Sequence, residues 1–173
     1  MFHFDSAALR NRLASIPLSS QVAFALACAE RLANSAASTD ELPRKARHLA
    51  YRYVQGEPPE AAAVEKAIRD LEASPDLDRD DYAAAFYALE CGRKTDTQAA
   101  VWAAQRAYDY CNLVAQGTLQ FTAYDADIER QLLAHPAVQA ELGYQNQDLD
   151  DLIQDASNGV LVVTRARSSS SAA

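Results

Sequence analysis

Two charged residues, Glu30 and Arg31, interrupt an otherwise apolar stretch of the sequence. A buried charge needs a partner, so one interpretation is an internal ion pair or hydrogen-bond network that fixes helix register. The other is a polar site in a cleft, where loss of solvent would perturb the pKa of the carboxyl group. In that second case His48 or His135 would join the pair, and the chain would be a small enzyme with a site inside a helical bundle.

No metal, cofactor or catalytic motif stands out elsewhere. The three histidines are far apart in sequence, and neither HxxxH nor CxxC spacing occurs. The acidic run at 76–81 lacks the glycine and the final carboxylate of a calcium loop, so we expect a loop and a helix start. No glycine cluster could cradle a phosphate. We therefore predict no cofactor and no metal, and we expect three buried, reduced cysteines, namely Cys28, Cys91 and Cys111.

A second set of candidate residues lies on the segment 95–117. Four side chains project close together beside a polar stripe, and these are Trp102, Arg106, Asp109 and Leu113. Trp102 and Arg106 have the i,i+4 spacing of a cation–π contact, and both residue types are common at binding hot spots. The alternative is a half-buried tryptophan packed under a neighbouring helix.

The segment 95–117 is also predicted to be the central helix of the fold. Thr95 and Gln98 could form a capping box at its start, and Gly117 could end it with a left-handed turn. The face with Ala100, Ala104, Ala107, Cys111 and Val114 is apolar and small, which allows close approach of neighbours. We expect this helix to lie in the middle of a bundle.

The rest of the chain predicts an all-α fold. Glycine and proline are few, at five and six residues, and alanine and leucine dominate over valine and isoleucine. A single helical domain over residues 1–163, with about seven or eight helices, would precede a disordered tail at 164–173. Further helices are expected at 7–15, 21–35, 42–55, 60–74, 82–91, 125–134 and 136–156, and short extended pieces at 118–124 and 159–163.

Within the helix expected at 42–55, the apolar spacing would turn the basic side chains to water. These side chains belong to Arg44, Lys45, Arg47 and Arg52. We expect the helices at 82–91 and 95–117 to form an antiparallel hairpin, because few residues separate them.

Acidic residues outnumber basic ones by 24 to 16, which gives a net charge of −8. This charge opposes binding to nucleic acid or to an anionic membrane. Residues 57–91 and 125–155 carry ten and eight acidic side chains, and the second run includes Asp148, Asp150 and Asp151. They are either solvated helix faces or an acidic surface for a basic protein. The absence of a leader-like or membrane-spanning stretch predicts a cytoplasmic location.

Several short segments occur in an order that resembles the YjaG-like family of bacterial proteins of unknown function. They are Val22-Ala-Phe24 before Glu30-Arg31, the helix ending at Cys91, His135-Pro-Ala-Val138 with Glu141, and Ser157-Asn-Gly159. The resemblance spans about residues 15–163. It implies an all-helical cytoplasmic bacterial protein and supplies no catalytic residues.

Together these observations favour a non-enzymatic, acidic protein-binding module over the small enzyme. One concrete form is an immunity-type inhibitor that covers a basic toxin, since acidic complementarity accelerates association with a basic site. The candidate contact residues are those named on the segment 95–117 together with Asp148, Asp150 and Asp151.

Overall fold

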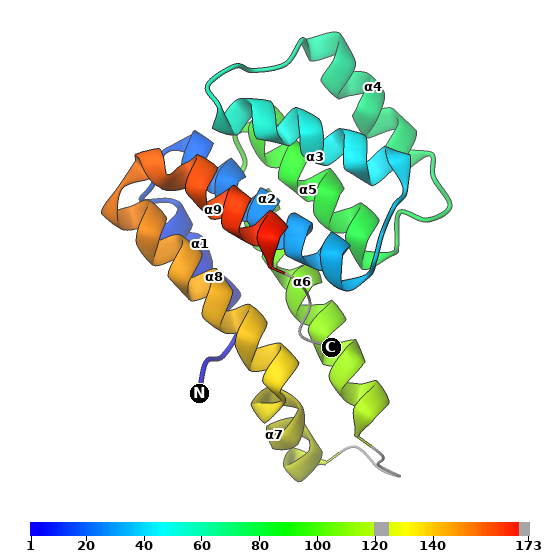
Figure 1. Cartoon of the computed structure of the whole chain (residues 1–173), viewed down its shortest axis with the longest axis vertical. Coiled ribbons are helices and arrows are strands. Elements are labelled where there is room, and N and C mark those ends of the chain that lie inside the picture. The colour runs from blue at the N-terminus through cyan, green and yellow to red at the C-terminus, as the bar shows by residue number, and fades with distance from the viewer. Residues whose placement is uncertain (120–124, 170–173) are drawn as a thin grey trace.

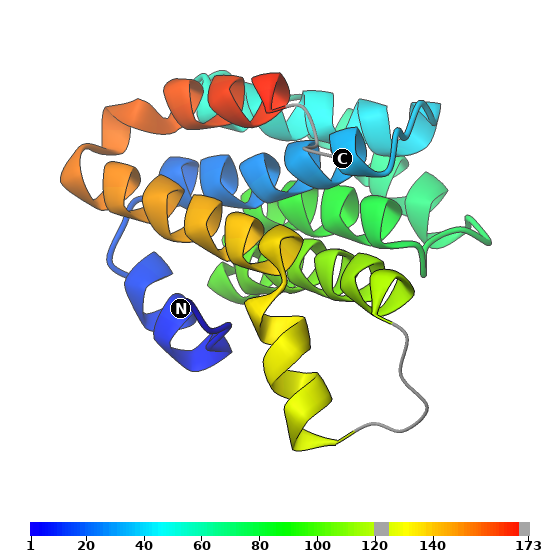
Figure 2. The ribbon, with the colours of Figure 1, turned by 60° about the horizontal axis from the view of Figure 1, so that its bottom comes forward.

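Helix α2 (Leu18–Ser35) runs through the middle of a helical bundle in the computed structural model of this chain (Figures 1 and 2). The structure describes residues 1–119 and 125–169, and within these ranges every regular element is helical. The other elements are α1 (Ser6–Leu13), α3 (Glu41–Val54), α4 (Ala61–Glu72), α5 (Asp80–Lys94), α6 (Thr97–Thr118), α7 (Ala126–Ala134), α8 (Pro136–Gln154), the 3₁₀ turn η1 (Ala156–Asn158) and α9 (Gly159–Ser168). The predicted all-α single domain is confirmed, with one helix more than expected among the described residues.

The prediction that the segment 95–117 is the central helix is wrong. All residues from Ser20 to Ala33 of α2 are buried, and α2 packs against α3, α5, α6, α8 and α9. The buried residues of α6 lie in its first half except for Ala115, and Val114, on its expected inner face, is 41% exposed. Both helices are rich in alanine, so the choice between them depends on tertiary contacts that the local pattern does not contain.

The ends of α6 also differ from the prediction. The N-cap is Asp96, whose carboxylate accepts from the backbone N–H of Gln98 at 2.9 Å. Thr95 instead ends α5 in the left-handed conformation with φ of 54°. Gly117 does not end the helix, which continues to Thr118. The predicted α5–α6 hairpin is confirmed, with only two residues between the helices.

The predicted extended piece at 159–163 is a helix, and so are residues 164–168 of the predicted disordered tail. Helix α9 buries Gly159, Val162, Val163 and Ala166, a spacing of three and four residues that places them on one face. This face packs on α2, where a Cβ on Gly159 would meet the Cβ of Ala23 at 3.3 Å. The predicted extended piece at 118–124 lies mostly outside the described residues, and Thr118 belongs to α6.

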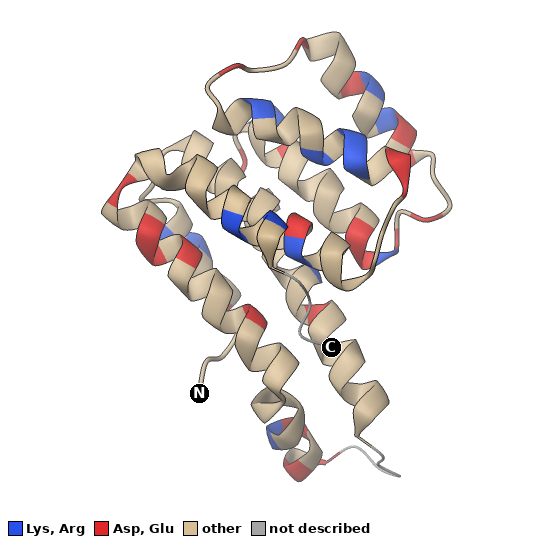
Figure 3. Cartoon of the chain, viewed as in Figure 1, with Lys and Arg blue, Asp and Glu red and all other residues tan. Residues whose placement is uncertain are grey.

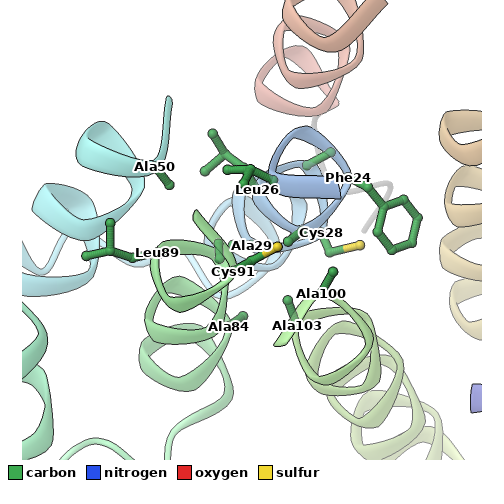
Figure 4. Close-up of a cluster of buried hydrophobic side chains, with 14 of the residues drawn as sticks. Phe24, Leu26, Cys28, Ala29, Ala50, Ala84, Leu89, Cys91, Ala100 and Ala103 are labelled. Atoms are coloured by element: carbon green, nitrogen blue, oxygen red, sulfur yellow. The ribbon is translucent and has the colours of Figure 1, made fainter. Parts of the chain in front are cut away.

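The main core is formed where α2, α3, α5 and α6 meet (Figure 4). Small side chains such as Ala29, Ala84 and Ala100 fill it together with Phe24 and Leu89. Alanine lets helix axes approach closely, and the area removed from water contributes roughly 25 cal/mol per Å². Close packing around α2 is therefore what positions its two charged residues.

Candidate functional site

Glu30 lies near the C-terminal end of α2 and links this helix to α3 and α9. Its Oε2 accepts from Arg47 Nε of α3 at 3.2 Å, and its Oε1 accepts from Arg167 Nε of α9 at 3.0 Å. The Arg167 guanidinium also lies 4.2 Å from the ring centroid of Tyr51, a cation–π contact. One carboxylate thus holds two guanidinium groups together.

Arg47 was expected to face water, and this prediction is wrong. The residue is only 7% exposed, and its Nη1 is buried without a hydrogen-bond partner in the described part of the chain. An unmet buried donor costs about 1–3 kcal/mol and calls for an explanation. Position 47 lies between the buried residues Ala46 and Leu49, and only the distant Glu30 makes its burial tolerable.

Arg31, one position later, faces α8. Its Nε and Nη2 donate to the two carboxylate oxygens of Glu141 at 2.9 and 3.1 Å, and its Nη1 donates to Asp148 Oδ2 at 2.5 Å. Burial disfavours the charged guanidinium, but its interactions with Glu141, Cys28 and Asp148 together outweigh burial and raise the pKa of Arg31 well above its usual value. The ring of Tyr144 covers this cluster, with its centroid 5.5 Å from Arg31 Cζ.

Other elements extend the Arg31 network. Gln145 of α8 donates to Glu141 at 3.0 Å and to the carbonyl of Ala104 at 3.1 Å, which ties the cluster to α6. Arg165 of α9 donates to Asp148 and pairs with Asp151 at 2.8 Å. Both residues lie in internal ion networks, which was one of the two interpretations of the sequence, but Glu30 and Arg31 belong to two separate networks.

The residues of the predicted enzyme site do not converge. Glu30 and His48 line one cavity, whereas Arg31 is turned toward α8. His135 caps α8, where its Nδ1 accepts from the Ala137 N–H and its Nε2 lies 3.0 Å from the Thr118 hydroxyl. Of the predicted combination, Glu30 and Arg31 with either His48 or His135, only Glu30 and His48 line the same cavity.

Three acidic candidates are engaged within the chain. Asp148 is 1% exposed and bonded to two arginines. Asp150 pairs with Arg12 of α1, and Asp151 pairs with Arg165. Many acidic side chains in the run 125–155 therefore form ion pairs or cap helices within the chain. Because Asp148 is buried, its prediction as a contact residue is wrong.

The candidate residues on α6 do share an outer face. Trp102 is 45% exposed and its ring centroid lies 5.2 Å from that of Tyr87 on α5. Leu113, about three turns further along, is 61% exposed. We name this surface, formed by Trp102, Tyr87, Arg106, Asp109 and Leu113, the α6 face.

The charged residues of the α6 face have their own partners. Arg106 Nη1 donates to Asp80 Oδ1 of α5 at 3.3 Å, in place of the predicted contact with Trp102. Asp109 accepts from Gln105 at 2.7 Å. Partial burial raises the pKa of Asp80, the hydrogen bond from Arg106 opposes this shift, and repulsion from the Asp109 carboxylate adds to it.

Two of the three cysteines that were predicted to be buried are buried. All three are free, and Cys28 and Cys91 are buried, while Cys111 is half-buried. Burial raises the pKa of Cys91 and of Cys111 to about 12. Across residues 1–119 and 125–169, no cluster of histidine, cysteine or acidic side chains could hold a metal ion.

One cavity was not anticipated from the sequence. It has a volume of about 390 Å³ and lies where α2, α3 and α9 meet. We name it the basic pocket, and its lining residues are Glu30, Glu41, Arg44, Lys45, Arg47, His48 and Arg167. Figure 3 shows basic residues along α3 and near the C-terminal end of α9. The basic residues at 44–48 are a sequence feature that could have indicated this pocket. Arg167 could not, because it lies in the predicted disordered tail.

Comparison of the chain with protein-family models, with curated proteins and with solved structures finds no match. Among the described residues, no helix is both long enough and apolar enough to cross a membrane. Functional inference therefore depends on the geometry of the two surfaces, the α6 face and the basic pocket.

Proposed function

We propose that this chain is a non-catalytic protein-binding module whose contact surface is the α6 face. The observation that carries the proposal is the half-exposed Trp102 on a long helix, whose ring contacts the Tyr87 ring in a tilted arrangement. Tryptophan, tyrosine and arginine are enriched at binding hot spots, and the two aromatic side chains bury a large area at a small cost in conformational entropy. Leu113, on the same side of α6, would extend the apolar contact.

The partner that fits this surface is a basic protein. The chain carries a net charge of −8, and at the α6 face Arg106 pairs with Asp80 while the Asp109 carboxylate lies near enough to repel Asp80. Opposite charge on the partner would accelerate association, most strongly at low salt. An immunity-type inhibitor of a basic toxin, in the cytoplasm of a bacterium, is the concrete form of this proposal, and the YjaG-like resemblance remains a hypothesis beside it.

Photo-crosslinking tests the contact surface directly. A benzophenone side chain at Leu113 should crosslink one basic protein in cells, and Trp102→Ala should abolish that product because the hot spot is lost. Leu161 on α9 is the matched control, since it is also apolar and 58% exposed. No product from position 113, or the same product from position 161, would sink the proposal.

The immunity version has its own test. A toxin encoded beside this gene should arrest growth when expressed alone, and co-expression of this chain should restore growth, whereas the Trp102→Ala variant should not. A genomic neighbourhood without such a toxin would eliminate the immunity role while leaving the α6 face as a binding surface.

A further inference from the structure

The basic pocket carries a local charge opposite to that of the whole molecule. Four permanently cationic side chains line it, from Arg44, Lys45, Arg47 and Arg167, against the two carboxylates of Glu30 and Glu41. An excess of two positive charges therefore sits in one concavity of a chain whose net charge is −8. The positive side chains around this cavity repel one another, and a bound anion would reduce that repulsion.

The arginines in this pocket are only partly bonded. Both Arg47 and Arg167 bind Glu30 through Nε, and Arg47 Nη1 is buried without a hydrogen-bond partner in the described chain. Arg47 is more than nine-tenths buried, and within residues 1–119 and 125–169 its hydrogen-bond partner is Glu30, through Nε. Its Nη1 can therefore donate to an incoming oxygen without loss of that bond.

The remaining cations are available to a ligand. Arg44 and Lys45 are exposed and form no ion pair with other described residues. Arg167 is held over the ring of Tyr51, which orients its guanidinium before any ligand arrives. His48, also exposed, adds imidazole nitrogens at the rim.

We propose that the basic pocket binds a small molecule through a phosphate group. A phosphate monoester carries between about 1.5 and 2 negative charges near neutral pH, which matches the excess charge of the pocket. Arginine and lysine supply the fork-shaped and point-charge donors that phosphate oxygens accept. The cavity of about 390 Å³ is large enough for the phosphate and a small organic group. A long polyanion is disfavoured, because the surrounding molecule is acidic.

Calorimetric titration of the intact protein tests this proposal. The probes are inorganic pyrophosphate, ribose 5-phosphate and citrate, each at the same ionic strength set with sodium chloride. Saturable one-to-one binding of pyrophosphate or ribose 5-phosphate is expected. Binding of citrate alone would overturn the assignment to phosphate, and binding of no probe would overturn the site itself.

Paired variants locate the site. Arg44→Ala/Lys45→Ala removes two exposed cations and should weaken phosphate binding about a hundredfold, at roughly tenfold for each charge-assisted contact. Arg10→Ala/Arg69→Ala removes the same charge from exposed positions outside the pocket and should change affinity less than about twofold. Equal losses in both variants would show general charge attraction and would overturn the proposal. The thermal midpoint of each variant checks that it remains folded.

Discussion

Glu30 and Arg31 are consecutive in α2, and each joins a different ion network. Glu30 binds Arg47 and Arg167 toward α3 and α9, whereas Arg31 binds Glu141 toward α8. Successive side chains of a helix point in directions about 100° apart around its axis, so adjacent residues of α2 can form ion pairs with helices on two different sides. These two residues position the basic pocket on one side and a fully paired cluster on the other.

Replacement of Arg31 by methionine should destabilise the protein strongly. The buried carboxylates of Glu141 and Asp148 would lose their shared cation, and breaking a buried pair in this way costs about 3–5 kcal/mol. The free energy of unfolding from urea denaturation measures this loss. Arg12→Met is the control, because the Arg12–Asp150 pair is exposed and should contribute at most about 1 kcal/mol. Similar losses in both variants would contradict the buried network.

The helices with regular apolar spacing were predictable from the sequence. Residues 159–163 of helix α9 were predicted to be extended because valine favours strands in general, although Val162, Val163 and Ala166 have helical spacing. In a helix these side chains share one face, and packing against α2 buries that face. Tertiary packing therefore outweighs the β-strand propensity of valine in this segment.

The candidate sites were less predictable than the fold. An internal network at Glu30 and Arg31 followed from the high cost of burying charge. Their partners did not, because Glu141 and Arg167 lie more than a hundred residues away in sequence. The basic pocket forms only where α3 and α9 both pack against α2, and a local sequence pattern does not show which helices pack together.

Gly92 is expected to resist substitution by alanine. A Cβ at this position would lie 2.7 Å from Cδ2 of the Tyr53 ring, so the ring would have to move. Gly92→Ala should lower the free energy of unfolding by about 1–2 kcal/mol despite the better helix propensity of alanine. Thermal and urea denaturation measure the change.

Two controls sharpen this prediction. Against a Tyr53→Ala background, Gly92→Ala should instead stabilise the helix by up to about 1 kcal/mol, because the clash is gone. Gly117→Ala in α6 should also stabilise, since its Cβ would meet open space. Loss of stability at Gly92 that persists without the tyrosine ring would refute the steric account.

Two aspartates should contribute to stability with opposite dependence on pH. Burial raises the pKa of Asp80 above 3.8, so its contribution falls as pH rises from 3.8 through the folded-state pKa. A hydrogen bond from Lys66 lowers the pKa of Asp70, so its contribution is present above 3.8 and is lost as pH falls through the folded-state pKa. The stability of the native chain relative to Asp80→Asn should therefore decrease with pH, and relative to Asp70→Asn it should increase. Urea denaturation between about pH 3 and 7 measures both slopes, and slopes of one sign would contradict the assignment.

The cysteines should react slowly with thiol reagents while the chain is folded. Burial holds the pKa of Cys91 and Cys111 at about 12, so only about one thiol in ten thousand is ionised at pH 8. Absorbance after addition of Ellman's reagent should show slow release in buffer and three rapid equivalents in concentrated guanidinium chloride.

The slow native reaction should come first from Cys111. This thiol is half-buried in the second half of α6, where most residues are partly or fully exposed, whereas Cys28 and Cys91 are buried in the core around α2. Local opening of that half of α6 exposes Cys111 without unfolding the bundle. Cys111→Ser should therefore remove the first equivalent and leave the other two rates unchanged. A native chain that releases one equivalent at once, with or without Cys111, would show that another thiol is open to solvent.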